Sequence, residues 1–519
     1  MKRVAKSVNV IITRMVGEKV NWLLLIIFLV AIVVRFLYFP NDISFTYDQA
    51  RDAFIAREVV AGDLKIIGPP STFEGIFHGP LYYYIVGPLY QLSNGNPELV
   101  SAFLRISNVL GIFLVFMIAR NLFSQRIGLI AAMLFGLSFE QTQYAIFLGH
   151  PSLAVLAVLL FYLGLTLLFI KKERKGLIIA LFGLGLSIQF HFSLIILFLP
   201  LSLLLFLLRK RIPLLGEKTL MKSLIVFSIA TASYLLAEFN FNFRTIKSLV
   251  GFLLNRDGGA YLNMGNVIIV AQRFVHDNIF QAKSGWILLV LLLVLIYLFI
   301  KKKHRISSII LTTWLFGSLF IYLFDHSNLP PYQYSIAGSV SLVILTSYIL
   351  NKLIQKQSMI GLLLLGLVIS SNTHLIKNIN PGGNIVEIIV QDGMLLSKQK
   401  EVLDYIYQKT SGDKFSIGAI SNPFKVNTTW SYLFEWYGSE KYGYLPVWGG
   451  DYAEGFKGNM EIVNSRSKLP SKHFVIIEPT RGIYKPLISK MINEEDIFSE
   501  VLEEQSFGKF KIQFRQKKH

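Results

Sequence analysis

Long apolar runs separated by short polar segments fill the first three quarters of the chain. A continuous apolar stretch of roughly 17 to 25 residues can cross a hydrocarbon core about 30 Å thick as a helix. Eleven stretches reach or nearly reach this length, so the pattern predicts about 11 transmembrane helices. They lie at 22–39, 98–119, 127–143, 151–170, 176–190, 192–208, 223–239, 285–300, 306–324, 333–351 and 358–375.

Basic residues fall in every second loop between these stretches. Because cytoplasmic loops carry an excess of Lys and Arg, this alternation predicts the orientation of the chain. The N-terminus is then cytoplasmic, and the odd number of spans places the C-terminus outside the cell membrane. The first span lacks a cleavage motif after it and is expected to be retained. The clusters are Arg120/Arg126, Lys171–Lys175, Arg209–Arg211, Lys301–Arg305 and Lys352/Lys356.

One apolar stretch, residues 80–93, does not fit this scheme as a span. It is short, contains Gly87 and Pro88, and would invert every later basic cluster if it crossed the membrane. Its tyrosines suit the level of the lipid headgroups, so we expect a helix lying in the outer interface. "DQARDAFIAREVVAG" is expected to form another such helix within the outer segment 40–97.

The last part of the chain has a different pattern. Alternating runs such as "KFSIGAI" and "HFVIIEP" indicate strands, and residues 396–409 and 428–438 have helical periodicity. The chain therefore divides into a transmembrane domain, residues 1–394, and an extracytoplasmic soluble α/β domain, residues 395–519. The second domain contains no metal or phosphate-loop motif, which favours a supporting or acceptor-binding role. An Asn427-Thr428-Thr429 sequon lies within it, although such triplets often arise by chance.

Composition agrees with an integral membrane protein. Of 519 residues, 53% are hydrophobic and only 16% are charged, against about a quarter charged in soluble proteins. The net charge of +19 is concentrated in residues 1–394, with 33 Lys and Arg against 17 Asp and Glu, so it reports topology and implies no nucleic-acid partner. There is no cysteine, which excludes disulfides, thiolate metal sites and a cysteine nucleophile.

Polar residues gather at the ends of the spans that are predicted to lie outside. Ionisable groups at membrane depth are costly, so a one-sided collection indicates a functional site, whereas the alternative is a set of ordinary hydrated loops. The set comprises Asp42, Asp48, Arg51, Asp52, His78, Gln141, Gln143, His150, Gln189, His191, Glu238, Arg244, Asp325 and His326.

Asp48, Arg51 and Asp52 share one face of the predicted helix because their spacing is i, i+3, i+4. Partial desolvation would make Asp48 a better proton acceptor, and Arg51 would orient it. The alternative is a surface ion pair worth at most about 1 kcal/mol. His78 precedes Gly79-Pro80 at a predicted helix start, a place suited to binding an anion such as a phosphate, although a lone histidine is often structural.

Three motifs carry a resemblance to a known family: "YDQARDAFIAREVVAGD", "FHGPLYYY" and "LRISNVLGIFLVFMIARNLFSQRIGLIAAMLF". The chain resembles the GT-C glycosyltransferases of the protein O-mannosyltransferase and aminoarabinose transferase type. Members typically have an Asp-Glu pair after the first span, an H/K-P-P-L-Y segment, and a basic hairpin between the second and third spans. The likeness covers most of residues 20–375 as a pattern.

The resemblance implies roles for individual residues. Asp48 falls on the catalytic base, while Gln49 replaces the usual Glu. His78 falls on a Lys or His near the donor phosphate, and Gly79 replaces a proline. Arg105 and His326, the latter in "DHSNLPPYQYSIAG", match further site positions. Such enzymes use a polyprenyl-phosphate sugar as donor, generally without an essential metal or cofactor.

The sequence therefore favours a membrane glycosyltransferase that moves a sugar from a polyprenyl phosphate to an extracytoplasmic acceptor. Asp48 is the expected base, and Arg51, His78, Arg105, Arg244 and His326 are expected at the donor phosphate, with Arg256 as a further candidate. Asp52, Gln143, His150 and His191 are expected in support. A transporter or lipid flippase is the alternative, but transporters place charges near the midplane. A scaffold without activity is a third hypothesis, and a divalent ion held by Asp42, Asp48 and Asp52 also stays open. Nothing in the sequence indicates the sugar, the polyprenol or whether the acceptor is protein, lipid or glycan.

Overall fold

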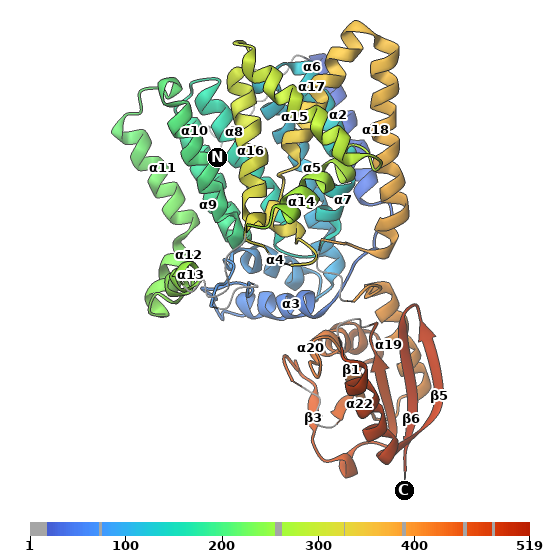
Figure 1. Cartoon of the computed structure of the whole chain (residues 1–519). Helices are drawn as coiled ribbons and strands as arrows, with labels where there is room; N and C mark the ends of the chain where they lie inside the picture. The colour runs from blue at the N-terminus through green and yellow to red at the C-terminus, as the bar shows by residue number, and fades with distance from the viewer. Residues whose placement is uncertain are drawn as a thin grey trace.

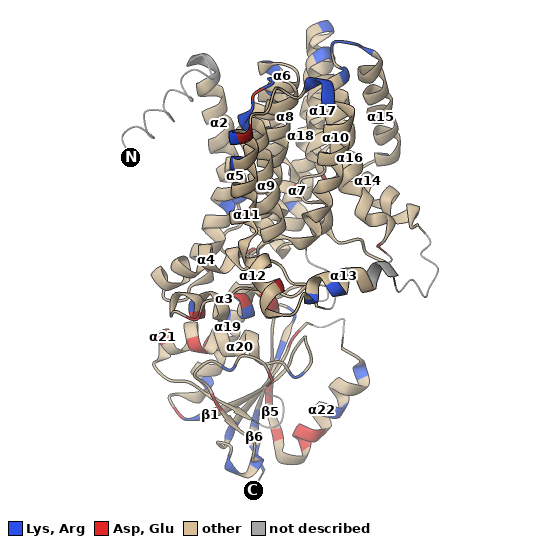
Figure 2. Cartoon of the chain, turned by 90° about the vertical axis from the view of Figure 1, so that its left-hand side faces the viewer, with Lys and Arg blue, Asp and Glu red and all other residues tan. Residues whose placement is uncertain are grey.

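The computed structural model describes residues 18–71, 75–254, 262–325, 327–386, 391–449, 454–479 and 483–518. A bundle of helices forms the larger part of the molecule, and a mixed α/β domain lies at one end of the bundle (Figure 1). Lys and Arg cluster at the opposite end of the bundle, where the basic loops connect the helices (Figure 2). This placement agrees with the alternation of basic loops along the sequence.

A helix lies in each of the eleven ranges predicted to cross the membrane. The bundle helices are α2 (Glu18–Arg35), α5 (Pro97–Leu122), α6 (Gln125–Leu137), α7 (Phe139–Ile146), α8 (Pro151–Phe169), α9 (Lys175–Phe190), α10 (Phe198–Leu207), α11 (Glu217–Ala230), α12 (Ala232–Asn240), α14 (Met264–Asn278), α15 (Ser284–Ile300), α16 (Arg305–Leu319), α17 (Val340–Lys356) and α18 (Ser358–Ile379).

Fewer of these helices meet a strict length criterion for crossing a membrane. Within the described residues, four are long and apolar enough, namely Pro97–Leu122, Pro151–Phe169, Arg305–Leu323 and Ser358–Gly382. The pair α11 and α12, bent by 58°, adds a fifth if it is one span, and five shorter apolar helices accompany them. The chain thus has the helices of a multi-pass membrane protein, while the count of eleven spans stays a prediction.

Two predicted spans are broken by hydroxyl side chains. Ser138 ends α6 and caps α7, because its Oγ accepts a hydrogen bond from the backbone N–H of Gln141 at 3.2 Å. Thr231 lies between α11 and α12, and its hydroxyl donates to the carbonyl of Phe227 at 2.9 Å. Such bonds from Ser or Thr to the preceding turn bend helices. Hydropathy alone does not reveal these breaks because the flanking residues remain apolar.

The outer segment contains the two short helices expected from the sequence. They are α3 (Tyr47–Val60) and α4 (Leu81–Leu92), which pack against each other. Figures 1 and 2 both show α3 lying across the end of the bundle, next to the C-terminal domain. A third helix of this kind, α13 (Arg244–Leu254), lies beside α12 at the same end (Figure 1). These helices form the layer in which the candidate site lies.

The predicted C-terminal α/β domain is confirmed. Its six-stranded sheet has the order β3-β2-β1-β4-β6-β5, in which the first four strands are parallel and the last two pairings are antiparallel. The strands are β1 (Phe415–Ile420), β2 (Val447–Gly449), β3 (Glu461–Val463), β4 (Lys472–Ile477), β5 (Ser499–Phe507) and β6 (Phe510–Lys517), with helices α19 (Leu396–Thr410), α20 (Thr428–Leu433), α21 (Ser439–Tyr442) and α22 (Lys485–Phe498). Asn427 is only 1% exposed, so its sequon is inaccessible in the folded chain.

The C-terminal domain is held against α3 by specific contacts. Arg57 on α3 forms an ion pair with Glu435 at 3.0 Å. The hydroxyl of Tyr432 donates to the carbonyl of Gly95 at 2.6 Å, and its ring meets that of Phe54 edge to face at 5.1 Å. These contacts fix the helix that carries Asp48 between two packed bodies. A site on α3 is therefore rigidly supported.

Candidate active site

The acidic cluster on α3 is a bridged set of three charges. Arg51 donates from Nη1 to Asp48 Oδ1 at 2.5 Å and from Nη2 to Asp52 Oδ1 at 2.8 Å. Asp52 is buried and also accepts the hydroxyl of Tyr83 at 3.2 Å, and burial raises the pKa of Asp52 although Arg51 opposes this shift. The Asp48 side chain is 52% exposed, so it is the carboxylate of this set that a substrate can reach.

Gln49, which stands where the family has a second acid, has a structural role at the start of α3. Its Oε1 accepts the backbone N–H of Thr46 at 2.9 Å and the Thr46 hydroxyl at 2.6 Å, which completes a capping box. The side chain is buried and faces the backbone. The residue that follows Asp48 in the sequence therefore supplies no second carboxylate.

Three histidines that are far apart in sequence have their rings close together. The ring of His78 lies 4.4 Å from that of His150 and 4.4 Å from that of His191, while the two outer rings are 5.6 Å apart. We call these residues the histidine trio. Burial and the charge of Arg51 lower the pKa of His150 to about 4, although the bond to the Phe190 carbonyl and the charge of Asp48 oppose this shift. The charges on α3 thus act directly on the trio.

The break between α9 and the short 3-10 helix Phe192–Leu197 holds the trio in place. The Phe190 carbonyl bonds His150 Nδ1, the Phe192 N–H donates to His78 Nδ1 at 2.9 Å, and the Ser193 hydroxyl lies 2.6 Å from His191 Nδ1. Helix ends leave such backbone groups without partners inside the helix, so they are available to the imidazoles. The trio is a consequence of this interruption.

His78 also lines a cavity of about 80 Å³ together with Arg244, Phe77 and Tyr234. Arg244 reaches it from the start of α13, and its side chain passes close to Gly75. The cavity therefore brings together Arg244, a permanent cation, and His78, an imidazole, both of which were expected at the donor phosphate.

Gly79 explains the second departure from the family pattern. Its backbone N–H donates to the carbonyl of Gln189 at 2.9 Å, and a Cβ at this position would overlap the side-chain oxygen of Gln189. A proline here would lack the donor and a larger residue would lack the space. The chain next to His78 is thus packed tightly on the end of α9.

Two expected residues lie away from this group. Arg105 is completely buried and forms a two-bond ion pair with Asp42, at 2.7 and 3.0 Å, while also donating to the carbonyl of Arg35. The structure therefore places Arg105 in a packing role rather than at an open phosphate site. Gln143 ties α7 to the segment after α18, since its side chain bonds Asn380 and the N–H of Ile385. His326 and Arg256 lie outside the described residues.

The ion pair between Asp42 and Arg105 also affects the hypothesis that Asp42, Asp48 and Asp52 hold a divalent ion. Asp42 is engaged by Arg105, and Asp52 by Arg51 and Tyr83, so neither is free to join Asp48 around an ion. Within the described ranges, no group of three or more His, Asp or Glu side chains has the arrangement of a metal site.

A second charged cluster, missed from the sequence, lies on α14. Arg273, His276 and Asp277 have the same i, i+3, i+4 spacing as the α3 cluster, which was the signal that could have revealed them. His276 Nδ1 is 2.6 Å from Asp277 Oδ1, which raises the pKa of His276, and the Tyr332 hydroxyl donates to Asp277 Oδ2 at 2.8 Å. The Arg273 guanidinium stacks on the Tyr332 ring at 3.8 Å. These residues line a hollow of about 310 Å³.

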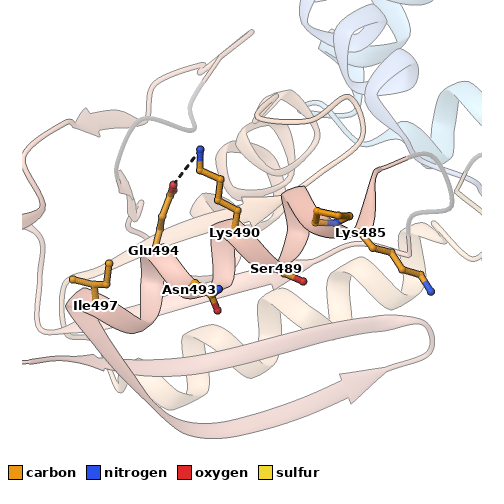
Figure 3. A pocket seen from close by; sticks show the side chains of 7 residues that line it. Lys485, Ser489, Lys490, Asn493, Glu494 and Ile497 are labelled. Carbon is orange, nitrogen blue, oxygen red and sulfur yellow. Dashed lines mark ion pairs between the residues drawn. The ribbon is translucent and has the colours of Figure 1, made fainter.

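A third hollow, on α22 of the C-terminal domain, is open and shallow (Figure 3). Its charged groups are Lys485, Lys490 and Glu494, and the last two form an exposed ion pair at 3.9 Å. Exposed pairs of this kind contribute little. This surface has no buried polar group aimed into it, in the part of the domain that is described, and it is the weakest candidate of the three.

Comparison with known proteins agrees with the fold and with the motifs. A family model described as dolichyl-phosphate-mannose-protein mannosyltransferase matches residues 77–237, which include all three members of the histidine trio. No curated protein matches the sequence significantly.

Solved structures resemble the chain over nearly its whole length. ArnT from Cupriavidus metallidurans bound to undecaprenyl phosphate has 13% sequence identity and a TM-score of 0.51, covering 95% of this chain and 98% of that chain. The apo form of the same protein has 11% identity and a TM-score of 0.51, over 96% and 98%. The Archaeoglobus fulgidus oligosaccharyltransferase tethered with an acceptor peptide has 14% identity and a TM-score of 0.49, over 80% and 63%.

These findings define the fold of the protein. The chain has the GT-C fold, with a helical core and a C-terminal sheet domain, and the resemblance to GT-C membrane glycosyltransferases seen in its motifs is confirmed. At such low identity the likeness to ArnT establishes the fold alone. What the chain acts on is a separate question.

Proposed function

We propose that this protein is an integral membrane glycosyltransferase that transfers one sugar from a polyprenyl-phosphate donor to an extracytoplasmic acceptor. The observation that carries the proposal is that an accessible carboxylate, Asp48, lies close enough to the histidine trio for its charge to act on His150, while His78 of the same trio shares a cavity with Arg244. The family model and the undecaprenyl phosphate bound by ArnT support the choice of a lipid phosphate as donor.

The chemistry needs a base and a place for departing negative charge. Asp48 removes the proton from the acceptor hydroxyl while this oxygen attacks the anomeric carbon. The bond from that carbon to the phosphate oxygen breaks, and the phosphate gains a second negative charge. His78 and Arg244, which share a cavity, stabilise this charge, and Arg51 holds Asp48 in position. His150, His191 and Asp52 act in support.

The position of the site suits a lipid-linked substrate. Helices α3, α4 and α13 lie at the end of the bundle opposite the basic loops, and we place this end at the extracytoplasmic surface of the cell membrane, with the N-terminus in the cytoplasm. The polyprenyl tail then stays in the bilayer while its phosphate reaches the headgroup level. Residues 395–519 lie outside, above α3. A transporter or flippase would instead be expected to carry its charges at the midplane.

The test is sugar transfer by the purified protein in lipid vesicles, supplied with a panel of labelled polyprenyl-phosphate sugars and an extract of outer-surface acceptors. Asp48→Asn should lower the transfer rate by at least about 100-fold, since a positioned general base contributes roughly 10² to 10⁴. Asp63→Asn is the matched control, because Asp63 is an exposed acid that pairs with Lys65 after the end of α3. Full activity of Asp48→Asn would remove this residue from its role, and inactivity with every donor would favour a transporter or scaffold.

A further inference from the structure

The hydrogen-bond partners of the histidine trio determine which nitrogen atoms carry protons. A carbonyl oxygen only accepts, so the bond between His150 Nδ1 and the Phe190 carbonyl requires a proton on that nitrogen. A backbone N–H only donates, so the bond from Phe192 N to His78 Nδ1 requires a lone pair there. Neutral His150 therefore has a free lone pair on Nε2, whereas neutral His78 carries its proton on Nε2.

This difference decides which ring can take up a second proton. His150 keeps its bond to Phe190 when Nε2 becomes protonated, because Nδ1 already donates. His78 would lose its bond to Phe192 if Nδ1 became protonated. His191 is bonded to a hydroxyl, which fits either state. His150 is also the least buried of the trio, since His78 and His191 are both 6% exposed.

The surroundings of His150 oppose a charge until a negative group arrives. Facing it are Asp48 and Arg51 from α3, Tyr82 from α4 at 6.2 Å between rings, and the rings of His78 and His191. Burial and Arg51 hold the pKa of His150 near 4, so it is neutral at physiological pH. A phosphate beside His78 would reverse this balance, because a nearby anion favours a protonated imidazole.

We propose that His150 is the final proton acceptor of the transfer reaction and carries a positive charge beside the departing lipid phosphate. This inference rests on the proposed function. The acceptor loses its proton to Asp48, and its oxygen bonds to the anomeric carbon. The phosphate leaves with the electron pair of the broken bond and becomes a dianion. The proton passes from Asp48 to His150 Nε2, and it returns to solvent when the lipid phosphate leaves.

A neutral trio suits the change in charge that the lipid phosphate undergoes during transfer. The donor is a phosphodiester with one negative charge, whereas the product is a phosphomonoester whose second pKa is about 6. The site must therefore accommodate one additional negative charge at the moment the sugar leaves. A preformed imidazolium would attract the monoanionic donor as well as the dianionic product, whereas an imidazole that gains its proton during the reaction adds its charge only as the second negative charge develops. His78 contributes as a hydrogen-bond donor through Nε2.

The experiment counts protons taken up when the purified full-length protein in lipid nanodiscs binds a polyprenyl monophosphate. Calorimetric titration in buffers of different ionisation enthalpy gives this number. The titration is done at pH 8, because the monophosphate is already a dianion at this pH before it binds. The wild-type protein should take up about one proton per lipid bound. It should take up none with the methyl ester of the same lipid, which has the single charge of the donor.

The variants isolate His150. Asn at this position retains a donor for the Phe190 carbonyl but cannot be protonated, so His150→Asn should take up no proton with either lipid and should bind the monophosphate about tenfold more weakly. His374→Asn, an exposed histidine bonded to Asn378 on α18, is the matched control and should behave as wild type. Equal proton uptake by His150→Asn and wild type overturns the proposal but leaves the proposed function intact.

Two outcomes remain distinguishable if His150→Asn fails to fold. The wild-type comparison of monophosphate and methyl ester then decides alone, since equal uptake with both lipids overturns the proposal. A wild-type protein that binds neither lipid contradicts the proposed function itself.

Discussion

The buried pair of Asp42 and Arg105 allows a packing role to be separated from a role in substrate binding. The Arg105 side chain has no exposed surface, and that of Asp42 is 2% exposed. Arg105 donates to both oxygens of Asp42, to the Arg35 carbonyl and to the Ser101 hydroxyl at 3.2 Å. The substitution Arg105→Gln removes the positive charge and keeps a polar side chain.

The expected cost follows from the burial of both partners. Removing one member of a buried ion pair leaves the other charge without compensation, which destabilises a protein by about 3 to 5 kcal/mol. Asp42→Asn should cost a similar amount for the same reason. The double variant Asp42→Asn/Arg105→Gln removes both charges of the pair and leaves neither partner uncompensated, so it should be less destabilised than the sum of the single variants by at least about 2 kcal/mol.

The assay is thermal unfolding of the purified variants in lipid nanodiscs, with binding of polyprenyl monophosphate measured in parallel. A packing role predicts that the double variant recovers stability and binds the lipid nearly as well as wild type does. A double variant that is stable but has lost lipid binding would show that Arg105 contacts the phosphate after all. A double variant whose loss of stability equals the sum of the two single losses would show no coupling and would contradict the ion pair.

Two further predictions concern a tightly packed glycine and a buried acid. Gly79→Ala should destabilise the protein by about 1 to 3 kcal/mol in thermal unfolding, because its Cβ would overlap Gln189, whereas Gly216→Ala, with no atom near its Cβ, should be neutral. Burial raises the pKa of Glu478 to about 7, although the Trp430 indole and the Gln391 amide donate to its carboxylate. An acid with a raised pKa in the folded state loses its contribution to stability as pH rises from about 4.5 to 7. The stability of wild type relative to Glu478→Gln should therefore fall by up to about 3 kcal/mol over this pH range. Hydrogen exchange of the β1 and β4 amides, corrected for intrinsic exchange rates, measures this difference. A stability difference that does not change with pH would contradict the prediction.

Much of the fold could be predicted from hydropathy and charge. Helices lie in all eleven apolar ranges, the short helices α3 and α4 lie where Pro80 and the acidic pattern predicted them, and the C-terminal sheet follows the alternating runs. The breaks at Ser138 and Thr231 were not predictable from hydropathy, because single hydroxyl residues within apolar sequence interrupt a helix only through specific backbone hydrogen bonds.

The candidate site was predictable only in part. Local spacing identified the cluster of Asp48, Arg51 and Asp52, since helix geometry alone brings these residues together. The stacking of His78, His150 and His191 depends on three separate segments converging, and no local pattern encodes it.

The burial of Arg105 was not predictable for a related reason. Its partner Asp42 is 63 residues away in the chain, so a packing arginine and a substrate-binding arginine have the same sequence signal. The α14 cluster of Arg273, His276 and Asp277 had the right spacing but lay in a segment expected to be a loop.

The most direct test of the central claim is an experimental structure of the protein with a polyprenyl-phosphonate sugar, whose carbon link prevents transfer. We expect the phosphonate to lie between His78 and Arg244, and Asp48 to face the anomeric carbon from the side opposite the phosphonate. A phosphonate bound instead in the hollow of Arg273 and His276, with Asp48 facing bulk water, would contradict this expectation.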